Sequence, residues 1–157
     1  MKSAAEVISK LNLVPHTEGG FYRQVYKDVN EVSLADGRLR KLVTHIYYLL
    51  KDQQISRFHK VLQPEIWHFY AGNGLRVYNL SPDLGVLKYT DLGVDGNYYH
   101  VVESNCWQAA SLLSGGFALV GCTVAPGFEF EDFSFLKEYE KESSAFLKKY
   151  SELAFLL

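Results

Sequence analysis

The stretch SRFHKVLQPEIWHFYAG, residues 56–72, contains two short runs in which apolar and polar side chains alternate. Gln63-Pro64 separates the two runs, and a Gly-Asn-Gly turn follows the second one. A period of two is typical of β-strands that bury one face, and segments rich in Gly or Pro form the turns between strands. This stretch therefore predicts strands at 56–60 and 65–70 with no helix between them, and two such strands can pair as a hairpin.

The same pattern continues in both directions and covers residues 20–133. Turn sequences such as Asp36-Gly37, Ser81-Pro82-Asp83 and Gly115-Gly116 separate short apolar runs. Strands that follow one another without crossover helices must be mainly antiparallel, and about ten of them indicate a sandwich or a closed barrel. Besides the two strands above, we predict strands at 21–26, 41–50, 75–80, 87–91, 98–102, 106–112, 117–124 and 128–133.

Both ends of the chain have helical rather than alternating patterns. Ser3 and Glu6 have the spacing of a capping box, and Pro15 disfavours helical geometry just before it, so a short helix is expected within residues 1–14. Apolar residues at helical spacing predict a second helix over 136–157, packed outside the sheet or against a partner subunit. We therefore expect one domain, residues 1–157, with a β-barrel at 20–133.

Composition and motifs exclude several classes of function. The net charge is −2 without blocks of like charge, so we expect neither nucleic acid nor membranes as partners. No apolar run reaches 18 residues and the first residues do not resemble a signal peptide, which predicts a cytoplasmic location. The two cysteines, Cys106 and Cys122, are interpreted as buried thiols, with a single bridge as the alternative. Motifs for binding nucleotide phosphates are missing, so no nucleotide cofactor is expected.

The best candidates for chemistry are His59 and Glu65, near the ends of consecutive predicted strands. Because side chains alternate, Arg57 and His59 should share one face, and Glu65 and Trp67 one face of the next strand. An imidazole and a carboxylate aimed into one cavity can act as general base and acid, or bind a divalent metal ion. The competing interpretation is a polar core pair, since a metal site usually has three or four ligands. His16, His45 and His100 are further candidate ligands, although nothing in their spacing requires that role.

Two other segments have open interpretations. In residues 15–23, Glu18, Tyr22 or Arg23 either rims a ligand cavity or crosses a dimer interface, or the segment is an ordinary Gly turn with exposed charges, which we favour. Around residue 107, Trp107 and Gln108 are candidates for the mouth of a barrel. The alternating series Phe128, Phe130 and Phe133 is interpreted as core and interface rather than a cofactor site.

The motifs taken together resemble a known family over nearly the whole chain. They are HxEGGFYR at 16–23, SxFH at 56–59, ExWHFYAG at 65–72, Trp107 and LVGCxVAPGF at 119–128. The sequence is similar to the fifth cupin subfamily, a domain of unknown function numbered 985. The resemblance implies an all-β, antiparallel jelly-roll barrel like that of dTDP-sugar epimerases, usually as a homodimer. Metal-binding cupins use a His-x-His…Glu set and a later His; here Arg57 stands at the first His and Trp107-Gln108 in the region of the later one.

These observations predict a small-molecule site inside the barrel. The first hypothesis is an isomerase- or epimerase-like reaction on a carbohydrate or another polar metabolite, with His59 and Glu65 as the acid–base pair and Arg57 or Arg23 as an anion anchor. The alternatives are a non-catalytic binding or sensing module, and an oxygenase or decarboxylase with a divalent metal on His59 and Glu65. The predicted ligand-pocket residues are Arg23, Arg57, Trp67, His68, Tyr70, Trp107 and Gln108.

Overall fold

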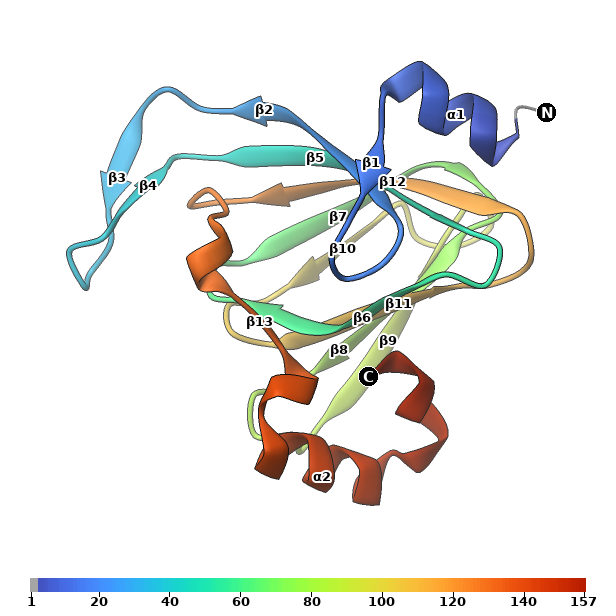
Figure 1. Cartoon of the computed structure of the whole chain (residues 1–157). Helices are drawn as coiled ribbons and strands as arrows, with labels where there is room; N and C mark the ends of the chain where they lie inside the picture. Colours follow the sequence, from blue (N-terminus) through green and yellow to red (C-terminus); the bar gives the residue numbers. More distant parts are fainter. Residues whose placement is uncertain (1–2) are drawn as a thin grey trace.

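Two antiparallel sheets face each other and form a jelly-roll barrel (Figure 1). The computed structural model describes residues 3–157, so Met1 and Lys2 of the predicted N-terminal helix lie outside the described residues. The first sheet has the order β1 (Val14–Pro15), β2 (Phe21–Lys27), β5 (Thr44–Lys51), β12 (Phe117–Val124), β7 (Glu65–Gly72) and β10 (Tyr99–Val102). The second has the order β13 (Phe133–Phe135), β6 (Ile55–Val61), β11 (Trp107–Leu112), β8 (Leu75–Leu80) and β9 (Leu87–Leu92). These sheets confirm the predicted fold class.

A two-stranded arm projects from the barrel beyond the ends of β2 and β5 (Figure 1). It is formed by β3 (Glu31–Ser33) and β4 (Leu39–Lys41). The predicted strand 41–50 therefore divides into two strands, because the chain leaves the arm after Lys41 and enters the barrel at Thr44. The arm carries Arg38 and Arg40, whose guanidinium groups reach back to Asp132 of the barrel.

The predicted hairpin between residues 56 and 72 is wrong. β6 pairs with β11 and β13, whereas β7 pairs with β12 and β10, so the link at Gln63-Pro64 crosses from one sheet to the other. The crossing is held in place because the buried Gln63 amide donates a hydrogen bond to Asp132. Both strands still aim alternate side chains at the barrel interior, from opposite walls.

The segment 128–133 is also not the strand that alternation predicted. A 3₁₀ turn, η1 (Phe130–Asp132), interrupts it, and only residues from Phe133 onward pair with β6. The buried Asp132 carboxylate accepts hydrogen bonds from Arg38, Arg40 and Gln63, and these bonds fix the turn. Interactions with distant residues thus override the local period of two.

Helices pack against part of the outer face of each sheet (Figure 1). The N-terminal helix α1 (Ala4–Leu11) begins with the predicted capping box of Ser3 and Glu6 and packs Val7 beside Leu49 of β5. The predicted C-terminal helix is present in three pieces, η2 (Leu136–Glu138), α2 (Glu140–Lys149) and η3 (Ser151–Leu156). They pack on the outer face of the five-stranded sheet. Within residues 3–157, no helix combines the length and the apolar character needed to cross a membrane.

Candidate functional site

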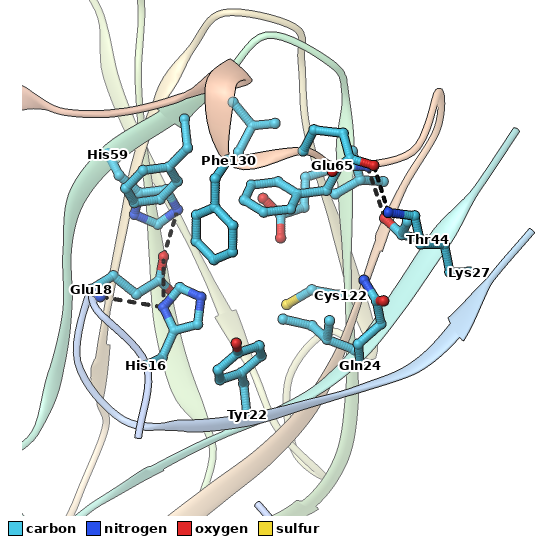
Figure 2. Close-up of a pocket in the computed structure, with 16 residues that line it drawn as sticks. His16, Glu18, Tyr22, Gln24, Lys27, Thr44, His59, Glu65, Cys122 and Phe130 are labelled. Atoms are coloured by element: carbon cyan, nitrogen blue, oxygen red, sulfur yellow. Dashed lines mark hydrogen bonds and ion pairs between the residues drawn. The ribbon is translucent and has the colours of Figure 1, made fainter. Parts of the chain in front are cut away.

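A cavity of about 250 Å³ occupies one end of the barrel, between the two sheets (Figure 2). Inward residues near one end of several strands line it, and further along these strands the inward residues are core. On β5, for example, Thr44 and Ile46 line the cavity whereas Tyr48 and Leu50 are fully buried core. The lining residues are His16, Glu18, Tyr22, Gln24, Lys27, Thr44, Ile46, His59, Val61, Glu65, Cys122, Val124, Phe128, Glu129, Phe130 and Phe133.

A bulge in β6 determines how His59 is held. The pairing with β11 shifts between His59 opposite Gln108 and Ser56 opposite Ala110, so β6 has one extra residue there. Arg57 lies within this bulge, and His59 Nδ1 lies 2.7 Å from its carbonyl oxygen. A carbonyl oxygen only accepts hydrogen bonds, so Nδ1 carries the proton and Nε2 points toward Glu18.

Glu18 enters the cavity from the segment between β1 and β2. Gly19 follows it with φ of +114°, and a Cβ at that position would lie 2.0 Å from the Ile55 carbonyl oxygen, so only glycine lets the two chains approach. The approach lets the Glu18 carbonyl accept the Arg57 N–H at 3.0 Å. It also lets the Ser56 hydroxyl donate to Glu18 Oε1 at 3.0 Å.

The contact between Glu18 and His59 requires a proton. His59 Nε2 lies 3.1 Å from Glu18 Oε2, and Nδ1 already uses the proton of a neutral ring. Either Glu18 is protonated and donates to Nε2, or the proton has moved to the ring and an ion pair forms. Burial raises the pKa of Glu18 and lowers the pKa of His59, and both shifts favour the neutral arrangement.

His16 completes this side of the cavity. Its Nδ1 accepts the backbone N–H of Glu18 at 3.2 Å, so a neutral His16 ring carries its proton on Nε2. Burial is the main cause that lowers the pKa of His16, which favours the neutral ring. The ring packs edge-on against Tyr22 with centroids 4.5 Å apart. His16, Glu18 and His59 lie together in Figure 2, with Cys122 and Gln24 on the other side of the view.

Glu65 is the second buried carboxyl group of the cavity, at the start of β7. Trp67 Nε1–H donates to Gln108 Oε1 at 2.8 Å, which turns the amide NH₂ of Gln108 toward Glu65 Oε2, to which it donates. Burial raises the pKa of Glu65 to about 7, opposed mainly by the nearby His59. Near neutral pH this carboxyl group is therefore able both to accept and to give up a proton.

Aromatic rings and one ion pair form the mouth of the cavity. Phe128, Phe130 and Phe133 line it, and Lys27 Nζ lies 2.6 Å from Glu129 Oε1, with both side chains partly exposed. The prediction that the Phe series is core and interface is thus incomplete, because these rings also face the cavity. The position of these rings depends on Asp132. Its Oδ2 accepts hydrogen bonds from Arg40 Nε at 2.7 Å and from Gln63 Nε2 at 2.8 Å.

Of the residues proposed from the sequence, His59 and Glu65 both line the cavity. They do so from facing sheets, and His59 contacts Glu18 rather than forming the expected pair with Glu65. Gln108 does not line the cavity but donates a hydrogen bond to Glu65, which does. Trp67 belongs to the hydrophobic core and orients Gln108 through its indole N–H.

The other predicted ligand-pocket residues do not line the cavity. Arg23 is exposed and donates to the Leu11 carbonyl, and the Arg57 guanidinium lies against the Glu18 carbonyl. His68 and Tyr70 lie on the outer face of the six-stranded sheet, on the opposite parity to Glu65, and Trp107 lies under the C-terminal helices. Side chains alternate between the two faces of a strand, so His68 and Tyr70 point away from the face of Glu65, and Trp107 points away from the face of Gln108.

Several cavity-lining residues were not among the predicted ligand-pocket residues, and the sequence contained a signal for only some of them. In residues 15–23 the favoured interpretation of an exposed Gly turn is wrong for Glu18, which is 6% exposed inside the cavity; the alternative, with Glu18 and Tyr22 at a cavity, matches their position. The paired glycines were the available signal, because they permit close backbone approach. Gln24, Lys27 and Glu129 carried no signal, since their strands and loops are placed by distant contacts.

The residues present do not fit a bound metal ion. Metal sites in proteins need three or four donors around one point. Across residues 3–157, no group of three or more His, Cys, Asp or Glu side chains is arranged to hold one. Gln108 is hydrogen-bonded between Trp67 and Glu65, so its amide is already used. No step of the proposed chemistry is therefore assigned to a metal.

Comparison with known proteins agrees with the fold. The model of the family described as "Cupin superfamily (DUF985)" matches residues 5–136. The uncharacterized protein YML079W of Saccharomyces cerevisiae is 34% identical over 175 residues, which cover 98% of this chain and 86% of the relative. Protein SO0799 of Shewanella oneidensis is 34% identical with a TM-score of 0.84, covering 99% of this chain and 95% of the other. A hypothetical protein of Leishmania major is 25% identical with a TM-score of 0.84, covering 98% and 95%. Because the family model spans most of the chain, this protein belongs to the DUF985 family of the cupin superfamily.

Proposed function

We propose that the cavity binds a small polar metabolite and catalyses proton transfer on it, in an isomerase- or epimerase-like reaction. One observation carries the proposal: two buried proton-exchanging groups, the Glu18–His59 contact and Glu65, line one cavity from facing walls. Polar core residues usually satisfy one another fully, whereas an acid and a base that both face an open space can act on a molecule in it.

The proposed reaction needs no oxidant and no reductant. The Glu65 carboxylate removes a proton from the carbon next to a carbonyl group, and the electron pair moves into an enolate. The proton held between Glu18 and His59 is then delivered to the enolate from the other side. Glu65 ends protonated and the Glu18–His59 contact ends without its proton, and exchange with water restores both. Compared with the pair expected from the sequence, His59 acts together with Glu18.

Deuterium exchange tests this proposal even while the product is unidentified. The protein is incubated in D₂O with a panel of aldoses, ketoses and related carbonyl metabolites, and incorporation at the carbon next to the carbonyl is followed by mass spectrometry. We expect incorporation with at least one compound, and a fall of about a hundredfold or more in His59→Gln and Glu65→Gln, the usual contribution of a general acid or base.

His68→Gln is the matched control, because it makes the same change on the outer face of the sheet. It should exchange deuterium at the wild-type rate, and thermal melting should show that all variants are folded. Unchanged exchange in folded Glu65→Gln would reject the assigned role. A compound that binds without any exchange would instead favour the non-catalytic binding module, for which the same cavity is suited.

A further inference from the structure

The charges around the cavity narrow the class of molecule that it can hold. Among the described residues that line it, Lys27 alone carries a permanent positive charge, and its ammonium group is engaged by Glu129 at 2.6 Å. A phosphate or carboxylate held in a buried site needs cations or several aimed N–H groups, because a buried anion without them is strongly disfavoured. The cavity therefore lacks a free anchor for an anion.

The arginines near the barrel are also engaged elsewhere. Arg38 and Arg40 bind Asp132, and Arg40 contacts Glu131 as well. Arg23 and Arg57, the anion anchors expected from the sequence, donate to the backbone carbonyls of Leu11 and Glu18. Two carboxyl groups, Glu18 and Glu65, stand inside the cavity instead, and an anionic ligand would raise the energy of either one in its charged form.

The remaining lining groups suit a molecule with hydroxyl groups. His16 Nε2–H is a donor, Tyr22 directs its hydroxyl into the cavity and Gln24 offers an amide, while Glu65 is an acceptor (Figure 2). The rings of Phe128, Phe130 and Phe133 supply flat apolar surfaces beside these polar groups. A volume of about 250 Å³ lies below the usual range for drug-sized ligands and suits one sugar ring, so a nucleotide-linked sugar would have to extend beyond the mouth.

We infer that the substrate is an uncharged, hydroxylated carbonyl compound of about the size of one monosaccharide, and not a phosphorylated or nucleotide-linked sugar. This inference rests on the proposed function, because it takes the same cavity to be the reaction site. The selectivity comes from the Lys27–Glu129 ion pair, which engages the permanent cation among the described lining residues, and from the carboxyl groups of Glu18 and Glu65.

Paired ligands test the inference directly. Glucose, galactose, mannose and fructose are titrated by calorimetry against the wild-type protein, each beside its 6-phosphate ester. At least one free hexose should bind ten times or more tighter than its ester, because the ester would bury an unpaired anion. An ester that binds as tightly as the free sugar, or failure of every free hexose to bind, overturns the inference.

A charge variant makes the test specific to the ion pair. Glu129→Gln frees Lys27, and the 6-phosphate should then gain about tenfold to a hundredfold in affinity, as expected for a charge-assisted hydrogen bond. Glu131→Gln makes the same change two residues away at an exposed side chain that pairs with Arg40 instead, and it should leave both affinities unchanged. An equal gain in the two variants would overturn the role of the ion pair.

Deuterium exchange in the same samples separates the two proposals. If a free hexose binds but does not exchange deuterium, the cavity prefers uncharged sugars as ligands, and the proposed proton transfer is rejected. Exchange confined to the phosphate esters rejects the substrate class and supports proton transfer.

Discussion

Burial of two carboxyl groups, Glu18 and Glu65, raises their pKa values and gives the cavity its acid–base character. Glu65 is 7% exposed, and its carboxylate form loses most of its hydration, which the hydrogen bond from Gln108 compensates only in part. Glu18 is 6% exposed and has the same tendency to keep its proton. Both residues are therefore expected to weaken the folded state whenever the solution favours the carboxylate.

The stability of the protein should depend on whether Glu65 is protonated. Its pKa is about 7 in the folded chain and near the ordinary 4.5 when unfolded, so between these pH values the folded state binds more protons. Raising the pH from 4.5 to 7 therefore lowers the free energy of unfolding, by about 3 kcal/mol for this group. Glu65→Gln lacks this contribution, so chemical denaturation across that range should show the wild type losing stability relative to the variant. Parallel curves would contradict the raised pKa.

At the scale of elements, the turn η1 and the arm β3–β4 depend on one carboxylate. Asp132 is 1% exposed and accepts hydrogen bonds from two arginines of the arm and from Gln63 in the β6–β7 crossing. Arg40 is itself 4% exposed, so each charge is compensated by the other. This cluster holds Phe130 and Phe133 over the cavity and joins three segments that are distant in sequence.

Removing the charge of Asp132 should loosen all three segments. Asp132→Asn removes the buried carboxylate that faces Arg40 and leaves this arginine only the exposed Glu131, which costs about 3–5 kcal/mol of unfolding free energy. Glu131→Gln on the same turn is the control; the Glu131 side chain is 61% exposed, so its contact with Arg40 contributes about 1 kcal/mol or less. Urea denaturation measures both changes, and hydrogen exchange should speed up over residues 128–133 in Asp132→Asn alone. Equal losses in the two variants would contradict this role of Asp132.

The sequence predicts features that depend on neighbouring residues, but not those that depend on distant contacts. Alternation depends on neighbours along the chain, so it correctly predicted nine strand regions and that His59 and Glu65 point inward. Glu18 lies in a segment with no period, and its place depends on Ser56, 38 residues away. The turn at Phe130 depends on Arg40, which binds Asp132 across 92 residues. The glycines beside Glu18 permit a close approach, but a single sequence does not identify the distant partner in such contacts.

Three apolar clusters form the hydrophobic core of the described residues. One fills the part of the barrel beyond the cavity, one lies under α1, and one lies between the five-stranded sheet and the C-terminal helices. In the last cluster Phe146 of α2 is fully buried and meets Phe58 of β6 with ring centroids 5.0 Å apart. The C-terminal segment is therefore part of the fold and covers a surface that the sheet would otherwise expose.

Truncating Phe146 should destabilise the entire domain. Phe146→Ala removes a fully buried ring and leaves a cavity against Phe58, with an expected loss of about 3–5 kcal/mol. Phe155→Ala makes the same change at a side chain that is 54% exposed, and its effect should stay near 1 kcal/mol or below. Thermal and urea denaturation compare the two variants. Similar small losses in both would contradict a stabilising role for the C-terminal helices.

The solid packing beyond the cavity has a kinetic consequence. Tyr48, Trp67 and Phe69 fill the barrel behind Glu65, so molecules enter and leave through the rim beside Lys27 and Glu129. In the proposed reaction, the product must leave before the next substrate molecule binds, and both use the same opening. Accumulated product should therefore inhibit the proposed reaction competitively, and a high concentration of substrate should restore the rate.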